Sequence, residues 1–155
     1  MKLKIAAVGR LRSGPEAELF ADYQDRFDKT GRSLALGPLA IQEVEAKKGG
    51  MAAEAILLEK AVAGATLTAV LDERGKTVSS PAFADLLAKW RDEGRSEVAF
   101  VIGGADGIDP TLRHKADFAL SFGQMVWPHA LVRVMLAEQL YRAASILAGS
   151  PYHRE

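Results

Sequence analysis

VAFVIGGADG, residues 98–107, joins a strongly apolar segment directly to a loop with three glycines. Five consecutive apolar residues, Val98–Ile102, are typical of a strand that is buried on both faces, as strands in parallel sheets are. The adjacent glycines Gly103 and Gly104 allow either a tight turn or a close approach of the backbone to a ligand. Both interpretations of the glycines stay open at this stage, but the buried strand indicates the fold class.

Outward from this segment, apolar runs alternate with stretches of helical periodicity along the whole chain. Such alternation predicts βαβ units and a mainly parallel sheet, so we expect one α/β domain over residues 1–155. The expected strands are residues 3–8, 34–44 (interrupted at Gly37-Pro38), 67–71, 98–102 and 118–122, with a turn at residues 72–75. The expected helices are residues 15–28, 51–63, a segment opened by Ser80-Pro81 and continuing through Trp90, a short helix from Asp109-Pro110, and residues 130–148.

Composition narrows the function classes. The chain has 20 basic and 20 acidic residues, and its zero net charge argues against a general DNA or RNA clamp, although a small local basic patch can still read a preassembled RNA surface. No cysteine is present, which excludes disulfides, thiolate zinc sites and a cysteine nucleophile, and no metal site is predicted. No segment approaches the roughly 20 apolar residues of a membrane span, and the first residues lack the pattern of a secretion signal. We therefore expect a cytoplasmic protein with no membrane partner.

The expected final helix, residues 130–148, is apolar on more than one face. A helix that is apolar nearly all round is buried on both sides. In a domain this small, the second side is expected to pack against another subunit, and a single thick core is the alternative. Glu138 and Arg142 are four residues apart on this helix, which is the spacing of a surface ion pair.

Three segments follow expected strands, at the edge where open α/β sheets bind ligands. Gly75-Lys76-Thr77, which starts at the last residue of the first segment (residues 71–75), matches the end of a phosphate-binding P-loop. The glycine that this motif requires five residues earlier is replaced by Val70, so the P-loop is rejected. The three segments are residues 71–75, 102–107 and 121–129.

The third of these segments is the richest in functional groups. Phe122, Met125 and Trp127 are suited to enclose an adenine ring, and core packing is the alternative. His129, just before the final helix, is either a capping or packing residue or a catalytic one. The terminal Pro151–Glu155 also has two interpretations, a disordered chain end or a working segment.

Taken in order, these motifs resemble the RlmH-type rRNA methyltransferases of the SPOUT class over the full length of the chain. One departure is Ser150, where relatives often carry a histidine, so no role is assigned to that position. The matching residues are Lys2-Leu3-Lys4 with Ala7-Val8-Gly9, Leu71-Asp72, Gly103-Gly104 with Asp106-Gly107, Pro128–Arg133, Glu138–Ala143 and Pro151–Glu155.

The resemblance implies a SPOUT-type, mainly parallel sheet flanked by helices, with a C-terminal trefoil knot, in a homodimer. It implies S-adenosylmethionine as cofactor and, as substrate, N3 of a pseudouridine in 23S rRNA within the large subunit or the assembled ribosome. It also implies that the tail folds over the cofactor pocket of its own or the neighbouring subunit. The implied cofactor contacts are Leu71, Gly103, Phe122, Gly123, Gln124, Met125, Val126 and Trp127, and the implied active-site edge is His129, Arg133, Tyr152, His153 and Arg154.

The chemistry of this substrate agrees with the missing cysteine, because methylation at C5 of a pyrimidine normally needs a cysteine adduct and methylation at nitrogen does not. N3 of pseudouridine is an imide N–H that must lose its proton to become nucleophilic. We assign proton acceptance to His153, because an imidazole is partly neutral near pH 7. Arg154 or Arg133 would stabilise the charge on the base, and Tyr152 would stack on it or bond its edge.

Overall fold

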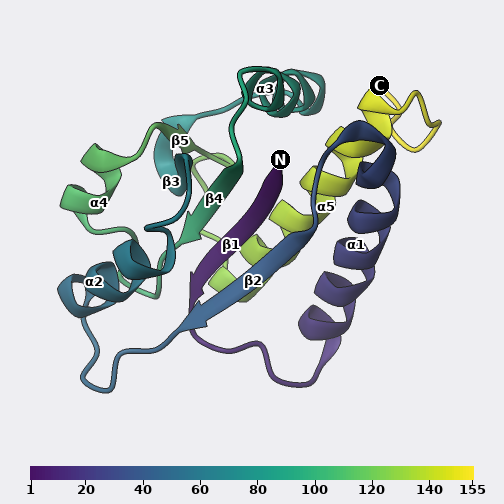
Figure 1. The fold of residues 1–155 in the computed structure, drawn as a ribbon. Coiled ribbons are helices and arrows are strands. Elements are labelled where there is room, and N and C mark those ends of the chain that lie inside the picture. Colours follow the sequence, from purple (N-terminus) through teal and green to yellow (C-terminus); the bar gives the residue numbers. More distant parts are fainter.

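The computed structural model, which describes residues 1–155, contains one five-stranded sheet with the strand order β2-β1-β4-β3-β5 (Figure 1). Every pair of neighbouring strands is parallel, so the predicted α/β class and parallel sheet are confirmed. The strands are β1 (Lys2–Val8), β2 (Leu39–Val44), β3 (Leu67–Lys76), β4 (Glu97–Ile102) and β5 (Phe118–Leu120), and the helices are α1 (Pro15–Gly31), η1 (Arg32–Leu34), α2 (Met51–Ala61), α3 (Ser80–Asp92), α4 (Pro110–Lys115) and α5 (His129–Leu147).

Both faces of the sheet are covered, which explains why its central strands are apolar without alternation. Phe100 of β4 belongs to a core of 23 buried residues that the sheet forms with α1, α3 and α5. Val101, its neighbour, points into a core of nine buried residues shared with α2 and α4 on the opposite face. Because all the strands are parallel, they end at the same edge of the sheet, between these two layers (Figure 1).

Helix α5 packs against the sheet between α1 and α3 of the same chain. Leu136, Leu140 and Ala144 are fully buried there, so the thick-core alternative accounts for most of the apolar surface of this helix. Leu131, which is 38% exposed, is the large apolar residue of α5 that the chain leaves open. No helix of the structure combines the length and apolarity that crossing a bilayer requires.

Two predicted boundaries are corrected by local backbone geometry. The strand expected from residue 34 begins at Leu39, because Arg32–Leu34 form a 3-10 turn and the backbone at Ala35 adopts a left-handed conformation with φ 56°. Helix α3 is capped by Ser79 and not by Ser80, since the Ser79 hydroxyl accepts a hydrogen bond from the Ala82 amide at 3.2 Å.

The turn expected at residues 72–75 is wrong, because β3 continues through Lys76. Leu71 and Lys76 both pair with Leu120, so the register of β3 against β5 shifts at an irregularity between these two residues. A Cβ on Gly75 would lie 2.6 Å from the carbonyl of Ala119, which explains the glycine that superficially suggested a P-loop. Strand β5 itself ends at Leu120, two residues earlier than expected, and leaves residues 121–128 as a loop.

Candidate functional site

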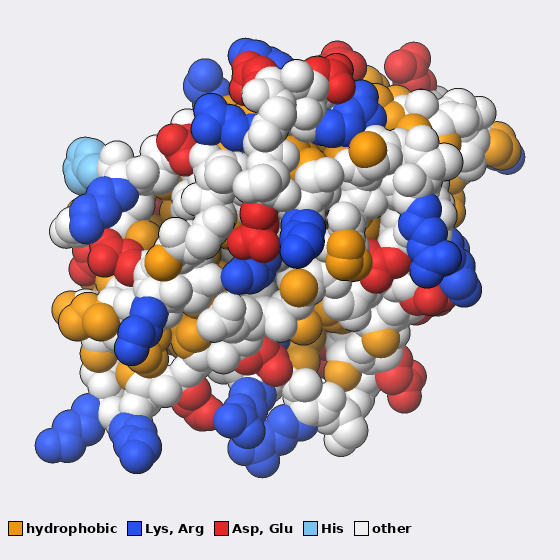
Figure 2. All heavy atoms as spheres, in the orientation of Figure 1, with side chains coloured by type: hydrophobic (Ala, Val, Ile, Leu, Met, Phe, Trp, Pro, Cys, Tyr) orange, Lys and Arg blue, Asp and Glu red, His pale blue; other side chains and the backbone are white.

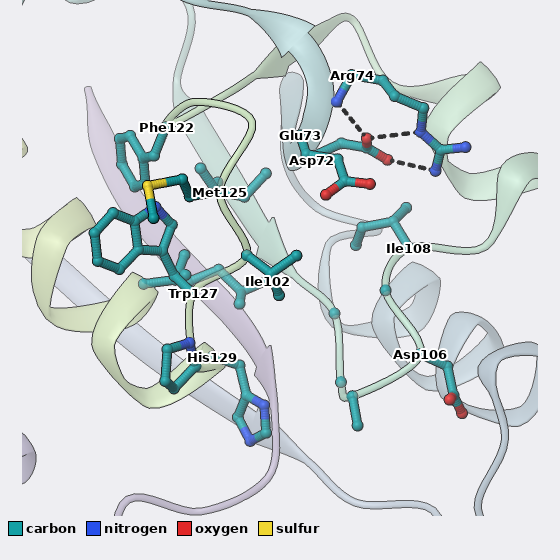
Figure 3. Close-up of a pocket in the computed structure, with 18 of the residues that line it drawn as sticks. Asp72, Glu73, Arg74, Ile102, Asp106, Ile108, Phe122, Met125, Trp127 and His129 are labelled. Atoms are coloured by element: carbon teal, nitrogen blue, oxygen red, sulfur yellow. Dashed lines mark hydrogen bonds and ion pairs between the residues drawn. The ribbon is translucent and has the colours of Figure 1, made fainter.

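A cleft of about 660 Å³ opens at the carboxyl ends of β3 and β4, next to the first turn of α5 (Figure 3). Its lining comes from residues 71–74, 102–108, 120, 122–123, 125–129 and 132. The three segments that follow strands in the sequence therefore meet at one place. Parallel strands bring their carboxyl ends to the same edge, which is why these distant segments converge.

One wall of the cleft is apolar and uncovered. Met125 is 74% exposed and Trp127 is 41% exposed, and Phe122 lies beside them (Figure 3). Ile102 lies at the base of the cleft, and Ile108 lies across it from the aromatic side chains. Large apolar side chains around a cleft leave surface that a flat, mostly apolar ligand such as an adenine ring would cover.

The glycine loop after β4 forms the base of the cleft through a tight turn. Gly104 pairs with Gly107, whose amide donates to the Gly104 carbonyl at 3.0 Å. A Cβ on Gly103 would lie 2.6 Å from the Gly107 carbonyl oxygen, and Gly107 has φ 83°. The tight-turn interpretation is therefore confirmed, because the space that a side chain at Gly103 would need is filled by the backbone of Gly107.

The opposite wall carries an ion-pair cluster around Asp72, whose side chain is 3% exposed. Arg74 donates to it from Nε at 3.0 Å and Nη2 at 3.2 Å, and Arg113 donates from Nη1 at 3.4 Å. Burial by itself would raise the pKa of Asp72, but these hydrogen bonds outweigh burial and lower that pKa below its ordinary value. The cluster holds the end of β3 against α4. Sequence reasoning named this segment but missed the cluster, whose only local signal is an arginine two residues after the aspartate.

Most predicted cofactor contacts lie together in this cleft. Gln124 is the exception, since it is exposed and outside the lining. Of the predicted active-site edge, only His129 lines the cleft. The predicted residues that line it are Leu71, Gly103, Phe122, Gly123, Met125, Val126, Trp127 and His129.

Arg133 lies beside the cleft rather than in it. Its side chain is 1% exposed and its Nη1 is 2.6 Å from Glu43 Oε2. Its Nη2 donates to the carbonyl oxygens of Val8 and Gly9 at 3.3 and 3.2 Å. Arg133 thus joins the start of α5 to the ends of β1 and β2 through its two Nη groups, whereas its buried Nε has no partner.

The C-terminal tail is docked on α5. The Tyr152 hydroxyl donates to Glu138 Oε1 at 2.9 Å, and Arg142 Nη2 donates to the same oxygen at 2.6 Å. Arg142 Nη1 lies 3.2 Å from Nδ1 of His153, and the Tyr152 ring packs on Tyr141 with centroids 4.5 Å apart. The predicted Glu138–Arg142 ion pair is therefore confirmed, and sequence reasoning missed that it also anchors the tail.

Burial, together with the hydrogen bond to Glu138, raises the pKa of Tyr152 above its ordinary value of 10.0. Arg154 and Glu155 beyond it are exposed. The 19 residues of α5 span about 28 Å, and the tail lies at the end of α5 that is remote from the strand ends (Figure 1). Within one chain, His129 and His153 are thus separated by the length of this helix.

Comparison with known proteins gives a consistent family assignment. Residues 1–153 match the model of a family described as "Predicted SPOUT methyltransferase". The chain is 66% identical over 155 residues to the "Ribosomal RNA large subunit methyltransferase H" of Ruegeria pomeroyi, with 99% of each chain covered. It is also 66% identical, with the same coverage, to the protein of that name from Roseobacter denitrificans.

Solved structures share the fold at low sequence identity. A probable methylase family protein from Haemophilus influenzae aligns with a TM-score of 0.58 at 11% identity, covering 99% of this chain and 70% of that one. A putative methylase family protein from Neisseria gonorrhoeae aligns with a TM-score of 0.54 at 14% identity, covering 99% and 86%. At these identities, the likeness extends to the fold alone.

Proposed function

Since this chain belongs to the SPOUT methyltransferase family, we propose that it transfers the methyl group of S-adenosylmethionine to N3 of a pseudouridine in 23S rRNA of the assembled ribosome. The observation that carries the proposal is the 66% identity, over essentially the full length of both chains, to proteins named ribosomal RNA large subunit methyltransferase H. The whole chain, residues 1–155, is proposed to act as one catalytic domain.

The cleft residues fit the proposed cofactor. Phe122, Met125 and Trp127 would hold the adenine ring, with the glycine loop that begins at Gly103 forming the base of the cleft beneath it. When bound, S-adenosylmethionine supplies an electrophilic methyl carbon. The chain's own task is then to place the base in line with that carbon and to exclude water.

The proposed proton acceptor is His153, acting on N3 directly or through water. Arg154, which is exposed, would stabilise the charge shared onto the two carbonyl oxygens of the base. We prefer it to Arg133, because the donors of Arg133 are directed at Glu43 and the strand ends. Tyr152 would stack on the base or bond its edge, and His129 at the cleft would contact the substrate there.

We propose that the tail of one subunit completes the cleft of the other in a homodimer. The length of α5 supports this, because a docked tail lies about 28 Å of helix away from the cleft of its own chain. The family fold adds the proposal of a trefoil knot.

The direct test incubates the purified protein with ribosomes and S-adenosylmethionine that carries a labelled methyl group. We expect label in 23S rRNA of ribosomes that contain pseudouridine, and none in ribosomes from a strain that lacks the modification. Calorimetry should show binding of S-adenosylmethionine to the protein alone. Cofactor binding without transfer to any ribosome would contradict the proposed reaction and favour a non-catalytic ribosome-binding role.

His153→Ala tests the proton acceptor. We expect turnover to fall by about 10²-fold or more, which is the usual contribution of a general base, with a changed pH profile and unchanged cofactor affinity. His114→Ala is the matched control, because His114 is exposed on α4 outside the cleft and should give wild-type turnover. Full turnover of His153→Ala with the wild-type pH profile would contradict the assignment.

A further inference from the structure

The loops that follow β1 and β2 lie at the same sheet edge as the cleft and contain four basic side chains: Arg10, Arg12, Lys47 and Lys48. We refer to these four residues as the basic rim. All four are exposed, and Figure 2 shows Lys and Arg side chains projecting from the lower edge of the molecule, where the strands of Figure 1 end.

The basic rim is a local concentration of charge in a neutral chain. Residues 9–14 and 45–50 include these four basic side chains and one acidic one, Glu45, so the two loops carry a net charge of +3. The chain as a whole has zero net charge, and the remaining residues therefore carry −3. Arg10 lies 3.8 Å from Glu45, but both side chains are more than 60% exposed, so this pair is weak. Arg12, Lys47 and Lys48 form no ion pair.

The first loop of the basic rim, residues 9–14, is held in a fixed position relative to the cleft. Glu43 Oε2 accepts hydrogen bonds from the Leu11 amide and from Arg133, both at 2.6 Å. This ties the first loop to Arg133 of α5. The residue before Arg133, Val132, lines the cleft. Ala7 of β1 pairs with Ile102 of β4, so the first loop starts about one strand spacing, roughly 5 Å, from the glycine loop of the cleft.

From this placement we propose that the basic rim binds backbone phosphates of the RNA strand on one side of the target nucleotide. The inference rests on the proposed function, since a nucleotide entering the cleft brings its flanking phosphates to the strand edge. Exposed Lys and Arg side chains beside the entry are the groups that neutralise phosphates without reading sequence. The fixed position of the first loop would orient the strand at the entry to the cleft.

The test compares two triple variants. Arg12→Ala/Lys47→Ala/Lys48→Ala removes three charges from the rim, and Lys2→Ala/Lys29→Ala/Lys89→Ala removes three exposed charges at the opposite edge of the sheet. The measurements are kcat and KM for methylation of ribosomes over a range of salt concentrations, and the Kd for S-adenosylmethionine. Binding to a protein-free fragment of 23S rRNA is measured separately, without turnover.

For the rim variant we expect kcat/KM to fall about tenfold or more through KM, with kcat and cofactor Kd within twofold of wild type. The slope of log kcat/KM against log salt should become shallower by about 2, since each lost contact to single-stranded RNA removes about 0.7. The control variant should behave as wild type. Equal salt slopes for the two variants would overturn the proposal.

The RNA fragment separates the possible partners. A rim variant that binds ribosomes weakly but the RNA fragment normally would place a ribosomal protein at this surface and overturn the proposal. A wild-type protein that transfers no methyl group would refute the proposed function instead. The salt dependence of binding to the RNA fragment would then still decide whether the basic rim binds phosphates.

Discussion

The cleft leaves Met125 74% exposed and Val126 85% exposed, whereas the tail at the other end of α5 partly buries Tyr152 and His153 against its own chain. The cleft residues have uncovered apolar surface and few internal partners. The tail is held by polar contacts, with Glu138 accepting from both Tyr152 and Arg142, and the buried Nε2 of His153 has no partner. Surface that awaits a ligand and side chains that are already anchored therefore lie at opposite ends of one helix.

This difference separates two tasks. The residues proposed to hold the cofactor all follow strand ends of a single chain. Cofactor binding should therefore depend on the cleft of that chain alone. The proposed chemical groups are remote and must reach a cleft from another subunit. In the docked tail, Nδ1 of His153 must accept the hydrogen bond from Arg142, since a guanidinium cannot accept one. The docked contact thus occupies a lone pair that proton acceptance requires.

Mixing two defective subunits gives the largest expected effect. Gly103→Val damages the cleft and His153→Ala/Arg154→Ala damages the tail, so we expect each pure homodimer to lose about 10²-fold or more in turnover. If the tail acts in trans, exchange of subunits in an equal mixture should restore about one quarter of wild-type turnover, because half of the dimers would then carry one intact composite site.

The control for this experiment mixes wild-type protein with the doubly defective Gly103→Val/His153→Ala/Arg154→Ala subunit. This subunit has neither an intact cleft nor an intact tail. Recovery in the first mixture should follow the rate of subunit exchange. No recovery after complete exchange, measured by mass spectrometry of the dimers, would mean that each tail serves its own chain and that the docked position is left during catalysis.

Gly103→Ala sharpens the comparison from the cleft side with a smaller effect. The added Cβ would meet the backbone of Gly107 at 2.6 Å, so the glycine loop must shift. Such overpacking costs about 1–3 kcal/mol, and we expect the Kd for S-adenosylmethionine to rise about tenfold or more. Docking of the tail should be unchanged. Calorimetry measures the Kd.

Gly64→Ala is its matched control, because a Cβ there meets no atom within 4 Å and the backbone φ is not positive. Its cofactor affinity should equal that of the wild type. An unchanged Kd in Gly103→Ala would show that the cofactor does not use the glycine loop, and the assignment of the cleft would have to move away from β4.

Sequence patterns were sufficient for the parts of the fold that depend on local order. The apolar run Val98–Ile102 predicts β4, and the helical spacing after Pro15 predicts α1. The strand-end rule then brings Leu71, Gly103 and Trp127 into one cleft without any knowledge of distances. These predictions succeed because burial and strand direction are set by residues close together in the chain.

What the sequence patterns could not supply depends on contacts between distant segments. Residues 72–75 look like a turn locally, but Leu120 pairs at both ends of this segment and keeps it within β3. Arg133 carries no local sign that Glu43, 90 residues earlier, takes its guanidinium. The docking of Tyr152 on Glu138 likewise needs the helix to be in place first. No periodicity records which of two surfaces a short terminal segment will contact.

The smallest expected effect is a shift in the titration of Tyr152, and it tests the tail side of the comparison. Burial and the Glu138 hydrogen bond raise the pKa of this phenol in the docked tail, so docking favours the protonated form. Docking is therefore fully stable below the ordinary pKa of 10.0 and weakens as the pH rises above it.

Tyrosinate absorbance should show a step above pH 10 that Tyr152→Phe removes. Glu138→Gln should move that step towards the ordinary pKa, because it removes the acceptor carboxylate. Glu155→Gln, which removes an exposed carboxylate at the end of the tail, should leave the step unchanged. Cofactor affinity should be the same in all three variants, since the proposed cofactor contacts come from the cleft itself and not from the tail. If Glu138→Gln leaves the titration unchanged, the tail is not docked on α5, and the contrast between an open cleft and an anchored tail fails at its second half.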